Sequence, residues 1–457
     1  MTLNARVFRE YDLRGVADRD FSDTDTVDLG RAVASHLAAK GQRRLALGRD
    51  CRLSSPRLHA AFRAGLLASG AEITDVGVVP TPLLYYAPFA FDLDGGIEVT
   101  GSHNPPEDNG FKIVSGRTTI HGDEIQAIRR RLASRDFVSG RGSASERDIL
   151  APYVAHARSR LELGPRRPKV VVDAGNGAGG PAALALYREL GFDVVPLFCD
   201  MDGRFPNHHP DPTVEENVAD LRAEVARTGA EVGLAFDGDA DRLGAVDGRG
   251  RIVWGDQLMI LFARAILGEV PGATFVSEVK CSQALYDEIE RAGGKPIMWK
   301  VGHSLIKAKM RETGALLAGE MSGHLFFAHR YLGFDDAVYA GARLLELLSR
   351  SPTTLAEHVD TLPKVTNTPE LRLEIADDIK FEVVRRAAAS LRARFPVVDV
   401  DGVRVQFPGG WGLVRASNTQ AALVLRFEAD TPERLRDIRA LVETEISRIR
   451  TELGGET

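Results

Sequence analysis

One short stretch, residues 100–112, brings together a hydroxyl, an imidazole and an amine in the string TGSHNPPEDNGFK. It follows an apolar run, residues 96–99, that predicts a buried strand, and two prolines stiffen the segment after Ser102. We expect the loop to fold back so that Lys112 comes towards Ser102. A nucleophile with acid–base partners has this composition, so Ser102, His103 and Lys112 are candidates for catalysis. For the tripeptide GSH alone, a polar turn with surface His103 and Lys112 is the simpler interpretation.

A second stretch, residues 236–243, reads FDGDADRL and carries carboxylates at alternate positions, Asp237, Asp239 and Asp241. In an extended or looped segment they point to one side, and such oxygen ligands suit a hard dication, Mg²⁺ rather than Zn²⁺. The stretch begins like an EF-hand loop but lacks the glycine of loop position 6 and the glutamate of position 12, where Gly248 falls. With Ser102 it indicates phosphoryl transfer, and an ordinary acidic turn is the alternative.

The composition limits the classes of protein to consider. A chain of 457 residues has room for about three domains, and a net charge of −6, from 58 basic and 64 acidic residues, does not indicate a nucleic-acid partner. Three scattered cysteines do not suggest a disulfide framework. No stretch approaches the roughly 18 apolar residues of a membrane span, so we expect a cytoplasmic protein without membrane contact.

Strand and helix patterns alternate along most of the chain. Apolar runs read as strands at 44–48, 72–79, 169–172, 232–236 and 274–279. This alternation predicts mostly parallel sheets with helices on both faces, whose ligands gather at the carboxyl ends of strands, where Ser102 lies. From about residue 363 the order changes to a helix, four strand-like runs and a terminal helix, which predicts an antiparallel sheet with helices on one face.

Polar residues also follow three strands of the third unit. Lys280 ends one strand, His303 follows another, and Glu320, Ser322 and His324 alternate after a third, so that these three can face one side and bind sugar hydroxyls. An exposed polar loop is the alternative.

A further loop gathers a guanidinium, two hydroxyls and an amide that can wrap a phosphate, on Arg415, Ser417, Asn418 and Thr419.

A glycine-rich turn after the strand 169–172 has the spacing of a dinucleotide-binding loop, with Gly175, Gly177 and Gly180. No acidic residue follows in the context expected for ribose binding, since the next strand runs into Cys199 and Asp200. Close packing of a helix on a strand explains the glycines more simply than NAD binding does.

The strings TGSHNP (100–105) and DGDADR (237–242) resemble the phosphoserine and metal-binding loops of the α-D-phosphohexomutases. Further stretches extend the resemblance to essentially the whole chain, most of all to bacterial phosphomannomutase/phosphoglucomutase. The predicted fold class is therefore α/β, with three consecutive mixed-sheet α/β domains plus a C-terminal α+β domain and the active site in a central cleft. We place the domains at 1–149 (phosphoserine), 150–252 (metal binding), 253–362 (sugar recognition) and 363–457 (phosphate binding).

The resemblance implies a mutase that interconverts the 1-phosphate and the 6-phosphate of a hexose, mannose or glucose. Phosphorylated Ser102 would give its phosphoryl group to the substrate, and the resulting hexose 1,6-bisphosphate would turn round and return its other phosphate. Ser102 and the three aspartates would hold Mg²⁺, and Arg242 would steady the phosphate. Lys112 would be the general acid/base, with a pKa lowered by its neighbours, and His103 would support Ser102 or the substrate.

The same resemblance assigns substrate contacts to residues of all four domains, and a movable fourth domain would let the intermediate reorient. The implied substrate-binding residues are Tyr11, Arg14, Lys280, Gly302, His303, Glu320, Ser322, His324, Arg415, Ser417, Asn418 and Thr419.

Some departures and alternatives stay open. The sugar loop reads GEMSGH and the phosphate loop RASNT, where many superfamily members carry RPSGT, which argues against phosphoglucosamine mutase. A phosphoglucosamine mutase or a glucose-only phosphoglucomutase is the nearest alternative. More distant ones are a phosphatase that uses Asp237 as nucleophile and a non-catalytic sugar-phosphate-binding protein. We expect a monomer or a weak dimer.

Overall fold

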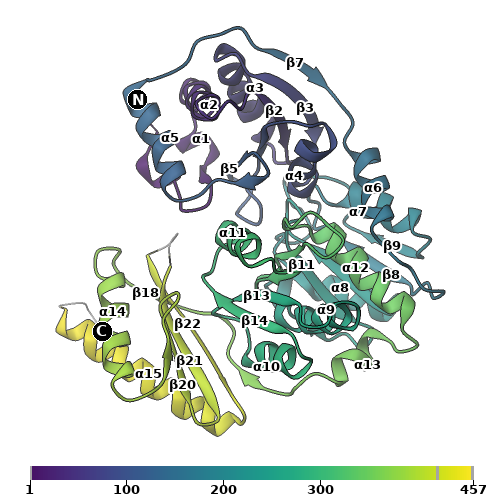
Figure 1. The fold of residues 1–457 in the computed structure, drawn as a ribbon, viewed down its shortest axis with the longest axis vertical. Coiled ribbons are helices and arrows are strands. Elements are labelled where there is room, and N and C mark those ends of the chain that lie inside the picture. Colours follow the sequence, from purple (N-terminus) through teal and green to yellow (C-terminus); the bar gives the residue numbers. More distant parts are fainter. Residues whose placement is uncertain (1–2, 418–420, 454–457) are drawn as a thin grey trace.

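The computed structural model describes residues 3–417 and 421–453 as four sheets with their helices. Figure 1 shows the four parts along an arc, with the first domain at the top and the fourth, in yellow, at the lower left. No helix in the described part of the chain is long and apolar enough to cross a membrane.

The first domain holds a seven-stranded mixed sheet. Its strands are β1 (Leu13–Val16), β2 (Arg44–Arg49), β3 (Glu72–Val78), β4 (Gly95–Val99), β5 (Asp108–Ser115), β6 (Thr118–Thr119) and β7 (Ser143–Glu146). Its helices are a short 3-10 helix (Ala5–Val7), α1 (Ala17–Asp20), α2 (Asp23–Ala38), α3 (Ser55–Ala68), α4 (Thr81–Ala90) and α5 (Asp123–Ser134). The order is β1-β5-β4-β2-β3-β7 with β6 beside β5, and β5 is antiparallel to each of its neighbours.

Lys112 therefore lies on a strand. We expected the loop after Ser102 to run on to Lys112, but β5 begins at Asp108 and pairs with β4. The stretch is a connection between two neighbouring strands, and it returns Lys112 along the sheet opposite Glu98. The two prolines after Ser102 correctly indicated a turn. The pairing of β4 with β5, which shortens the loop, has no signal in the local sequence.

The second domain holds a five-stranded sheet in the order β12-β11-β10-β8-β9. Its strands are β8 (Val170–Asp173), β9 (Val194–Leu197), β10 (Val232–Phe236), β11 (Leu243–Asp247) and β12 (Ile252–Val253). Its helices are α6 (Leu150–Ser159), α7 (Gly180–Glu189), a 3-10 turn (Glu215–Val218) and α8 (Ala219–Thr228). Strands β8, β9 and β10 are parallel, and the acidic loop leaves the carboxyl end of β10 as predicted.

The third domain holds a four-stranded sheet in the order β14-β13-β15-β16. Its strands are β13 (Thr274–Glu278), β14 (Lys295–Trp299), β15 (Leu317–Gly319) and β16 (Leu325–Phe327). Its helices are α9 (Gly255–Glu269), α10 (Gln283–Arg291), α11 (His303–Thr313), α12 (Ala337–Arg350) and α13 (Leu355–Asp360). Strands β13, β14 and β15 are parallel, which places their carboxyl ends, and the polar residues that follow them, at one edge.

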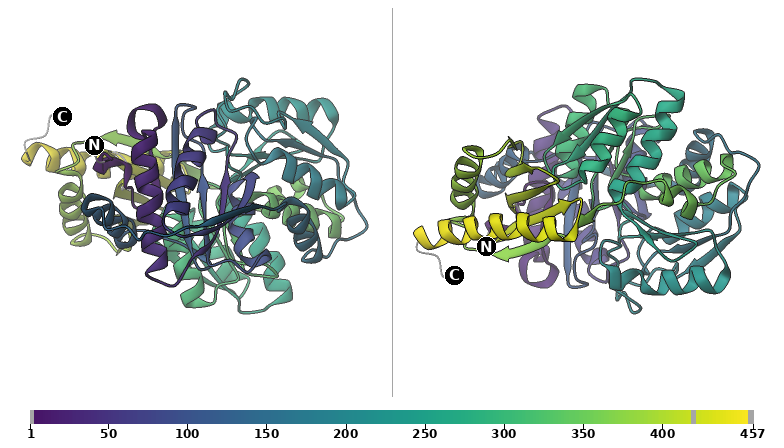
Figure 2. Two further views of the ribbon diagram at one scale, coloured as in Figure 1. Left: turned by 90° about the horizontal axis from the view of Figure 1, so that it is seen from above. Right: turned by 90° about the horizontal axis from the view of Figure 1, so that it is seen from below.

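The fourth domain holds a six-stranded antiparallel sheet in the order β17-β22-β21-β20-β19, with β18 beside β22. Its strands are β17 (Thr366–Asn367), β18 (Leu371–Glu374), β19 (Val397–Val398), β20 (Val403–Phe407), β21 (Gly410–Ala416) and β22 (Ala422–Ala429), and its helices are α14 (Lys380–Arg392) and α15 (Pro432–Glu452). The two helices contact each other and the central strands, and Figure 2 shows α15 along the sheet. The predicted α+β character is confirmed.

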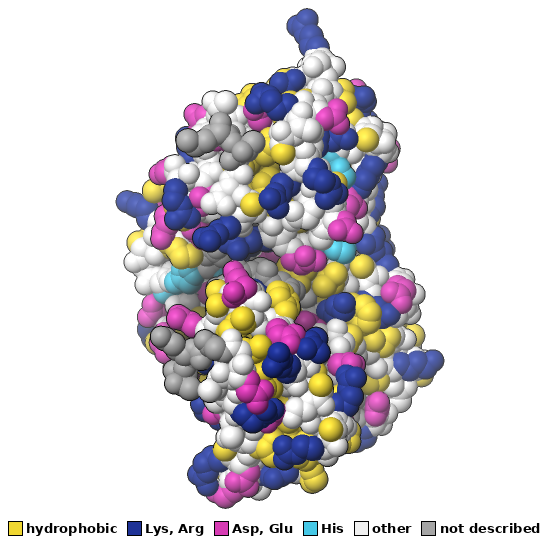
Figure 3. All heavy atoms as spheres, turned by 90° about the vertical axis from the view of Figure 1, so that its left-hand side faces the viewer, with side chains coloured by type: hydrophobic (Ala, Val, Ile, Leu, Met, Phe, Trp, Pro, Cys, Tyr) yellow, Lys and Arg dark blue, Asp and Glu magenta, His cyan; other side chains and the backbone are white. Residues whose placement is uncertain are grey.

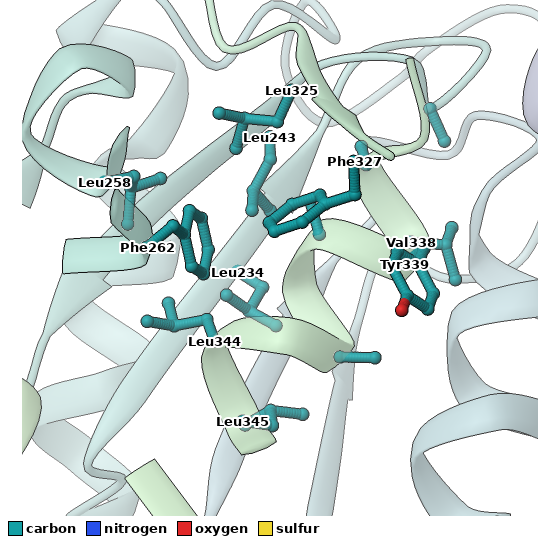
Figure 4. Packing of buried hydrophobic residues seen from close by; sticks show 14 of the residues in the cluster. Leu234, Leu243, Leu258, Phe262, Leu325, Phe327, Val338, Tyr339, Leu344 and Leu345 are labelled. Atoms are coloured by element: carbon teal, nitrogen blue, oxygen red, sulfur yellow. The ribbon is translucent and has the colours of Figure 1, made fainter. Parts of the chain in front are cut away.

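One hydrophobic core joins the first three domains. Figure 4 shows its centre, where Leu234 and Leu243 of the second sheet pack with Leu258 of α9, Phe327 of β16 and Leu344 of α12. Side chains of the first domain, from β2 and α4, belong to the same cluster. The fourth domain has its own core and meets the third domain through a small cluster around Trp411.

Candidate active site

Ser102 lies in the tight loop between β4 and β5 and is almost fully buried. Its backbone is left-handed, with φ of 50°, and its amide donates to Oγ1 of Thr100 at 2.8 Å. Its hydroxyl donates to Oδ2 of Asp237 at 2.8 Å. A non-glycine residue in this conformation costs about 1–3 kcal/mol and persists only where its surroundings enforce it. The fold therefore directs the Ser102 hydroxyl at the acidic loop.

Arg52 supports the Ser102 loop from inside the first domain, although no sequence motif singled it out. A Cβ on Gly101 would lie 2.5 Å from Cζ of Arg52, which explains the glycine. Asp50 lies 3.2 Å from Nε of Arg52 and accepts from the amide of Gly101. The fully buried guanidinium donates to four loop carbonyl oxygens, those of Ser102, Asn104, Pro105 and Asp108.

The acidic loop, residues 237–241, lies directly against Ser102. Its three aspartates are fully buried, and one oxygen of each lies within 4.8 Å of the others. Burial, followed by the charges of Asp241 and Asp239, raises the pKa of Asp237 well above its ordinary value. Oδ1 of Asp239 and Oδ1 of Asp241 have no hydrogen-bond partner in the described part of the chain. Orphaned, buried, hard oxygen donors are what a dication satisfies, so this loop and the Ser102 hydroxyl fit Mg²⁺.

Lys112 bridges two of these aspartates. Its ammonium donates to Asp239 at 2.6 Å and to Asp241 at 2.5 Å, and the hydroxyl of Thr81 donates to Asp239 at 2.5 Å. Burial opposes the charged form, but the two carboxylates raise the pKa of Lys112 well above its ordinary value. We expected neighbours that lower this pKa, and in this arrangement they raise it. A dication on the same carboxylates would reverse the sign, because it would repel the ammonium.

His103 makes its contact with the second domain. Its Nδ1 lies 3.2 Å from Oδ2 of Asp211, and Oδ1 of Asp211 accepts from the hydroxyl of Thr213. Burial and the nearby Arg242 lower the pKa of His103 to about 3, despite the opposing charge of Asp211. The imidazole is therefore neutral and held in place. Asp211 stands in the string HHPDP, which carried no chemical signal in the sequence.

Arg242 and His324 join the second domain to the third. Nε of Arg242 donates to Nε2 of His324 at 3.0 Å, and their backbones form an isolated bridge. The ring of His324 stacks on that of His303, with centroids 5.6 Å apart. Burial, reinforced by the charge of Lys307, lowers the pKa of His303 well below its ordinary value. Both predicted histidines thus lie at the rim of the acidic loop.

Tyr11 and Arg14 reach the same region from the first domain. The hydroxyl of Tyr11 donates to the carbonyl oxygen of Val301 at 2.7 Å, and Arg14 donates to the side chain of Asn104 at 2.6 Å. Gly302 has φ of 129°, and a Cβ there would lie 2.4 Å from the ring of Tyr11. Only glycine therefore fits between Tyr11 and the start of α11.

The loop after β15 differs from the extended segment that we expected. The amide of Glu320 donates to the carbonyl oxygen of His324 at 2.9 Å, so residues 320–324 form a tight turn. Strand-like alternation therefore does not apply to Glu320, Ser322 and His324. Glu320 is buried and accepts from the amide of Gly302 at 2.8 Å, whereas Ser322 is half-buried.

Lys280 and Arg415 lie where the third and fourth domains meet. Nζ of Lys280 donates to Glu370 at 2.9 Å. Nε of Arg415 lies 3.2 Å from Oδ2 of Asp401, which also accepts from the amide of Val301. Ser417 is buried. Asn418 and Thr419 lie outside the described residues.

Figure 3 looks at the side where the first domain lies above the fourth, and histidine and charged side chains are exposed at the edges of the band between the two halves. The glycine-rich turn plays a packing role. A Cβ on Gly177 would lie 2.6 Å from the carbonyl oxygen of Gly238, and one on Gly180 would lie 2.2 Å from that of Cys199. Gly177 lets the turn approach the acidic loop, and Gly180 lets the start of α7 approach the segment after β9, as the packing interpretation requires.

Four family models match successive parts of the chain. They are those of phosphoglucomutase/phosphomannomutase alpha/beta/alpha domain I (residues 5–139), domain II (151–250), domain III (254–365) and the C-terminal domain (370–445).

Individual relatives agree along the full length. A phosphomannomutase/phosphoglucomutase of Pseudomonas aeruginosa is 46% identical over 99% of this chain and 98% of its own. A phosphoglucomutase of Neisseria gonorrhoeae is 46% identical over 96% of this chain and 97% of its own. The crystal structure of a phosphoglucomutase/phosphomannomutase family protein from Burkholderia thailandensis, 43% identical, superimposes with a TM-score of 0.92 and covers 98% of both chains.

Proposed function

We propose a specific activity for this chain, which belongs to the phosphoglucomutase/phosphomannomutase family of α-D-phosphohexomutases and is a hexose phosphate mutase. The proposal is that it acts on both mannose and glucose phosphates through a phosphoserine at Ser102. Support for the role of Ser102 comes from one contact, its 2.8 Å hydrogen bond to Asp237 across a domain boundary. That contact brings a nucleophilic hydroxyl to a set of cation ligands. The amino-sugar and glucose-only alternatives are not favoured by the relatives.

Transfer begins with phosphorylated Ser102. A bond forms between a hydroxyl oxygen of the hexose phosphate and the phosphorus, and the bond from phosphorus to Oγ of Ser102 breaks. The proton of the hexose hydroxyl passes to a base, and Oγ of Ser102 takes up a proton. We assign Lys112 to this acid–base role, because it lies on the strand beside the Ser102 loop. His103 supports the loop through Asp211, and Arg242 steadies the phosphate.

Mg²⁺ is the proposed metal, held by Asp237, Asp239, Asp241 and Ser102. When bound, it would neutralise charge that builds up on the phosphoryl group during transfer. The fit rests on the oxygen-only donor set and on the two orphaned carboxylate oxygens. A hexose 1,6-bisphosphate is the proposed intermediate. If it escapes before returning a phosphate, Ser102 is left without one, and added bisphosphate, the proposed activator, phosphorylates Ser102 again.

The substrate contacts extend over the four proposed domains (1–149, 150–252, 253–362 and 363–457). Glu320 and Ser322 are proposed to bind ring hydroxyls, and the basic residues at the domain boundaries to bind the phosphates. The other proposed contacts are Tyr11, Arg14, Lys280, Gly302, His303, His324, Arg415, Ser417, Asn418 and Thr419.

The bisphosphate has to turn end for end, and we propose that the fourth domain moves to allow it. This domain has a core of its own, and it meets the third domain through a small apolar cluster and through hydrogen bonds of Lys280, Arg404 and Arg426. The separate core supports such motion. Amide-exchange protection at residues 366–371 should change when glucose 1,6-bisphosphate is added. Constant protection would contradict the motion.

We also propose a monomer or weak dimer in the cytoplasm. Cys51, Cys199 and Cys281 are free thiols, as in a reducing compartment.

The deciding experiment measures turnover of mannose 1-phosphate and of glucose 1-phosphate side by side, with Mg²⁺ and a trace of hexose 1,6-bisphosphate. Comparable rates are expected, together with a phosphate on Ser102 detected by mass spectrometry. Activity on one sugar alone would reject dual specificity. Full activity of a Ser102→Ala protein would reject the phosphoserine.

A further inference from the structure

Asp335 lies at the centre of a buried polar cluster behind the proposed catalytic groups. It is fully buried in the connection between β16 and α12, where its backbone bridges to Phe326. Oδ1 of Asp335 accepts from the ammonium of Lys307 at 2.8 Å. Oδ2 lies 3.2 Å from Nδ1 of His324 and 3.6 Å from Nδ1 of His303.

The contact with Arg242 shows which tautomer of His324 is present. Nε of an arginine always carries a proton, so Nε2 of His324 must accept at 3.0 Å through its lone pair. The single proton of the neutral ring then stands on Nδ1. That proton faces Oδ2 of Asp335, with Oδ1 of Asp241 farther away at 3.6 Å.

The same geometry excludes a second metal site at this place, although Asp241, His324 and Asp335 form a group that could hold an ion. A metal on Nδ1 of His324 would move the ring proton to Nε2, where it would point at the N–H of Arg242. The ammonium of Lys307 already neutralises Asp335. Nδ1 of His324 lies 3.2 Å from Oδ2 of Asp335, although neither atom has a hydrogen bond of good geometry in the described part of the chain. A dication at this place would set the N–H groups of His324 and Arg242 against each other.

Lys307 makes the carboxylate stable in this position. It lies one turn after His303 on α11, and its ammonium rests 4.5 Å from the centre of the Tyr85 ring. Burial opposes ionisation, but Lys307 and His324 hold the pKa of Asp335 well below its ordinary value. Asp335 is therefore an ionised acceptor whose place is fixed by the pair with Lys307.

We propose that Asp335 is the positioning residue of His324: it keeps the ring as the Nδ1–H tautomer and leaves the lone pair of Nε2 directed at Arg242 and the phosphate-transfer site. The consequence for turnover rests on the proposed function. The tautomer itself does not, so the two can fail separately.

The test is ¹⁵N NMR of histidine-labelled protein, with the His324 signals assigned from a His324→Gln variant. The unsubstituted protein should show a protonated Nδ1. In Asp335→Asn, the amide oxygen should turn to Lys307 and the amide N–H groups to His324, so the ring proton should move to Nε2. An unchanged Nδ1–H tautomer would overturn the proposal, because Arg242 and Asp241 would then suffice.

Asp336→Asn is the matched control. Asp336 is the adjacent buried carboxylate, but it accepts from the hydroxyls of Tyr153 and Tyr331 and caps α12 through the amide of Tyr339. The Asp336→Asn substitution should lower thermal stability without moving the proton of His324. If Asp335→Asn does not fold, the pair Asp335→Leu with Lys307→Met removes both charges, and it should abolish the single-tautomer signal. Retention of that signal would again overturn the proposal.

Kinetics separate positioning from packing. In Asp335→Asn, kcat should fall on the order of 10²-fold, because Arg242 loses the acceptor that orients it beside the phosphate, with KM for the hexose phosphate within about threefold. A large rise in KM with unchanged kcat would instead assign Asp335 to substrate binding and overturn the positioning role.

Discussion

The Oγ atom of Ser102 lies 2.8 Å from Oδ2 of Asp237, although 135 residues separate them and they belong to different domains. The serine has a left-handed backbone conformation in a loop whose carbonyl oxygens accept hydrogen bonds from Arg52, and the aspartate follows a strand of the neighbouring sheet. The nucleophile and its cation ligands are therefore assembled by domain packing.

Replacing Ser102 by alanine should abolish mutase turnover, by on the order of 10⁶-fold, because it removes the hydroxyl that carries the phosphoryl group in the proposed mechanism. Steady-state assays with glucose 1-phosphate and mass spectrometry of the protein check both turnover and phosphorylation. Ser322→Ala is the control, and it should stay phosphorylated. Retained turnover in Ser102→Ala would revive the alternative in which Asp237 is the nucleophile.

Lys112→Met should raise the affinity for Mn²⁺, used as a spectroscopic probe of the Mg²⁺ site, while it lowers kcat. The ammonium of Lys112 donates hydrogen bonds to the carboxylates of Asp239 and Asp241, so its removal frees both carboxylates to bind the ion. A gain of about tenfold corresponds to about 1.4 kcal/mol. Electron paramagnetic resonance titration measures it, with Lys309→Met, near Trp299, as control. Weaker Mn²⁺ binding would show that Lys112 does not compete with the metal.

Glu98 should make stability depend on pH. It is fully buried, and neither carboxyl oxygen has a hydrogen-bond partner in the described residues. Burial, then the charges of Asp50 and Asp239, raise its pKa well above the ordinary value. A raised folded-state pKa gives stability that is complete below the unfolded value, about 4.5, and is lost as pH rises through the folded value.

The free energy of unfolding of Glu98→Gln, which cannot ionise, should therefore exceed that of the unsubstituted protein by a growing margin above about pH 4.5. The slope should be at most about 1.4 kcal/mol per pH unit. Urea denaturation at several pH values measures the margin, and Glu72→Gln, at an exposed position, is the control. Parallel pH curves would show that Glu98 finds a partner in solution.

Arg404→Met should loosen the fourth domain. The buried guanidinium donates to the carbonyl oxygens of Val279 and Cys281 at 2.8 and 2.7 Å and lies 3.6 Å from the centre of the Trp411 ring. Its loss leaves buried acceptors unpaired, at a cost of about 2–5 kcal/mol. Amide exchange should accelerate in β20, β21 and β22, whereas Arg434→Met, which removes an exposed contact, should leave it unchanged. Equal exchange in both variants would refute this role.

The sequence predicted the chemistry of the site better than its geometry. The spacing of Asp237, Asp239 and Asp241 and the string around Ser102 are local, so their roles could be inferred without a structure. The groups that support them are side chains from distant segments, and pairing across domains leaves no trace in local spacing. Arg52, Asp211, Lys307 and Asp335 were missed for this reason.

Strand pairing explains the remaining differences. The alternation rule for Glu320, Ser322 and His324 assumes an extended chain, but β15 and β16 are antiparallel neighbours and require a tight turn between them. Lys112 was placed in a loop because the pairing of β4 with β5 cannot be read from residues 100–112. In both places the residue types indicated the chemistry correctly, but the local sequence did not predict the conformation of the backbone.

The core shared by the first three domains affects how the molecule comes apart. Because side chains of all three sheets belong to one packed cluster, a cavity made at Leu234 should weaken the packing of α4 in the first domain as well as the acidic loop. The strands beside the Ser102 loop also pack into a separate cluster of the first domain. The fourth domain, with a core of its own, can melt by itself. The chain should thus denature in at least two cooperative blocks, the fourth domain and the part joined by the shared core, rather than in four steps that follow the four family domains.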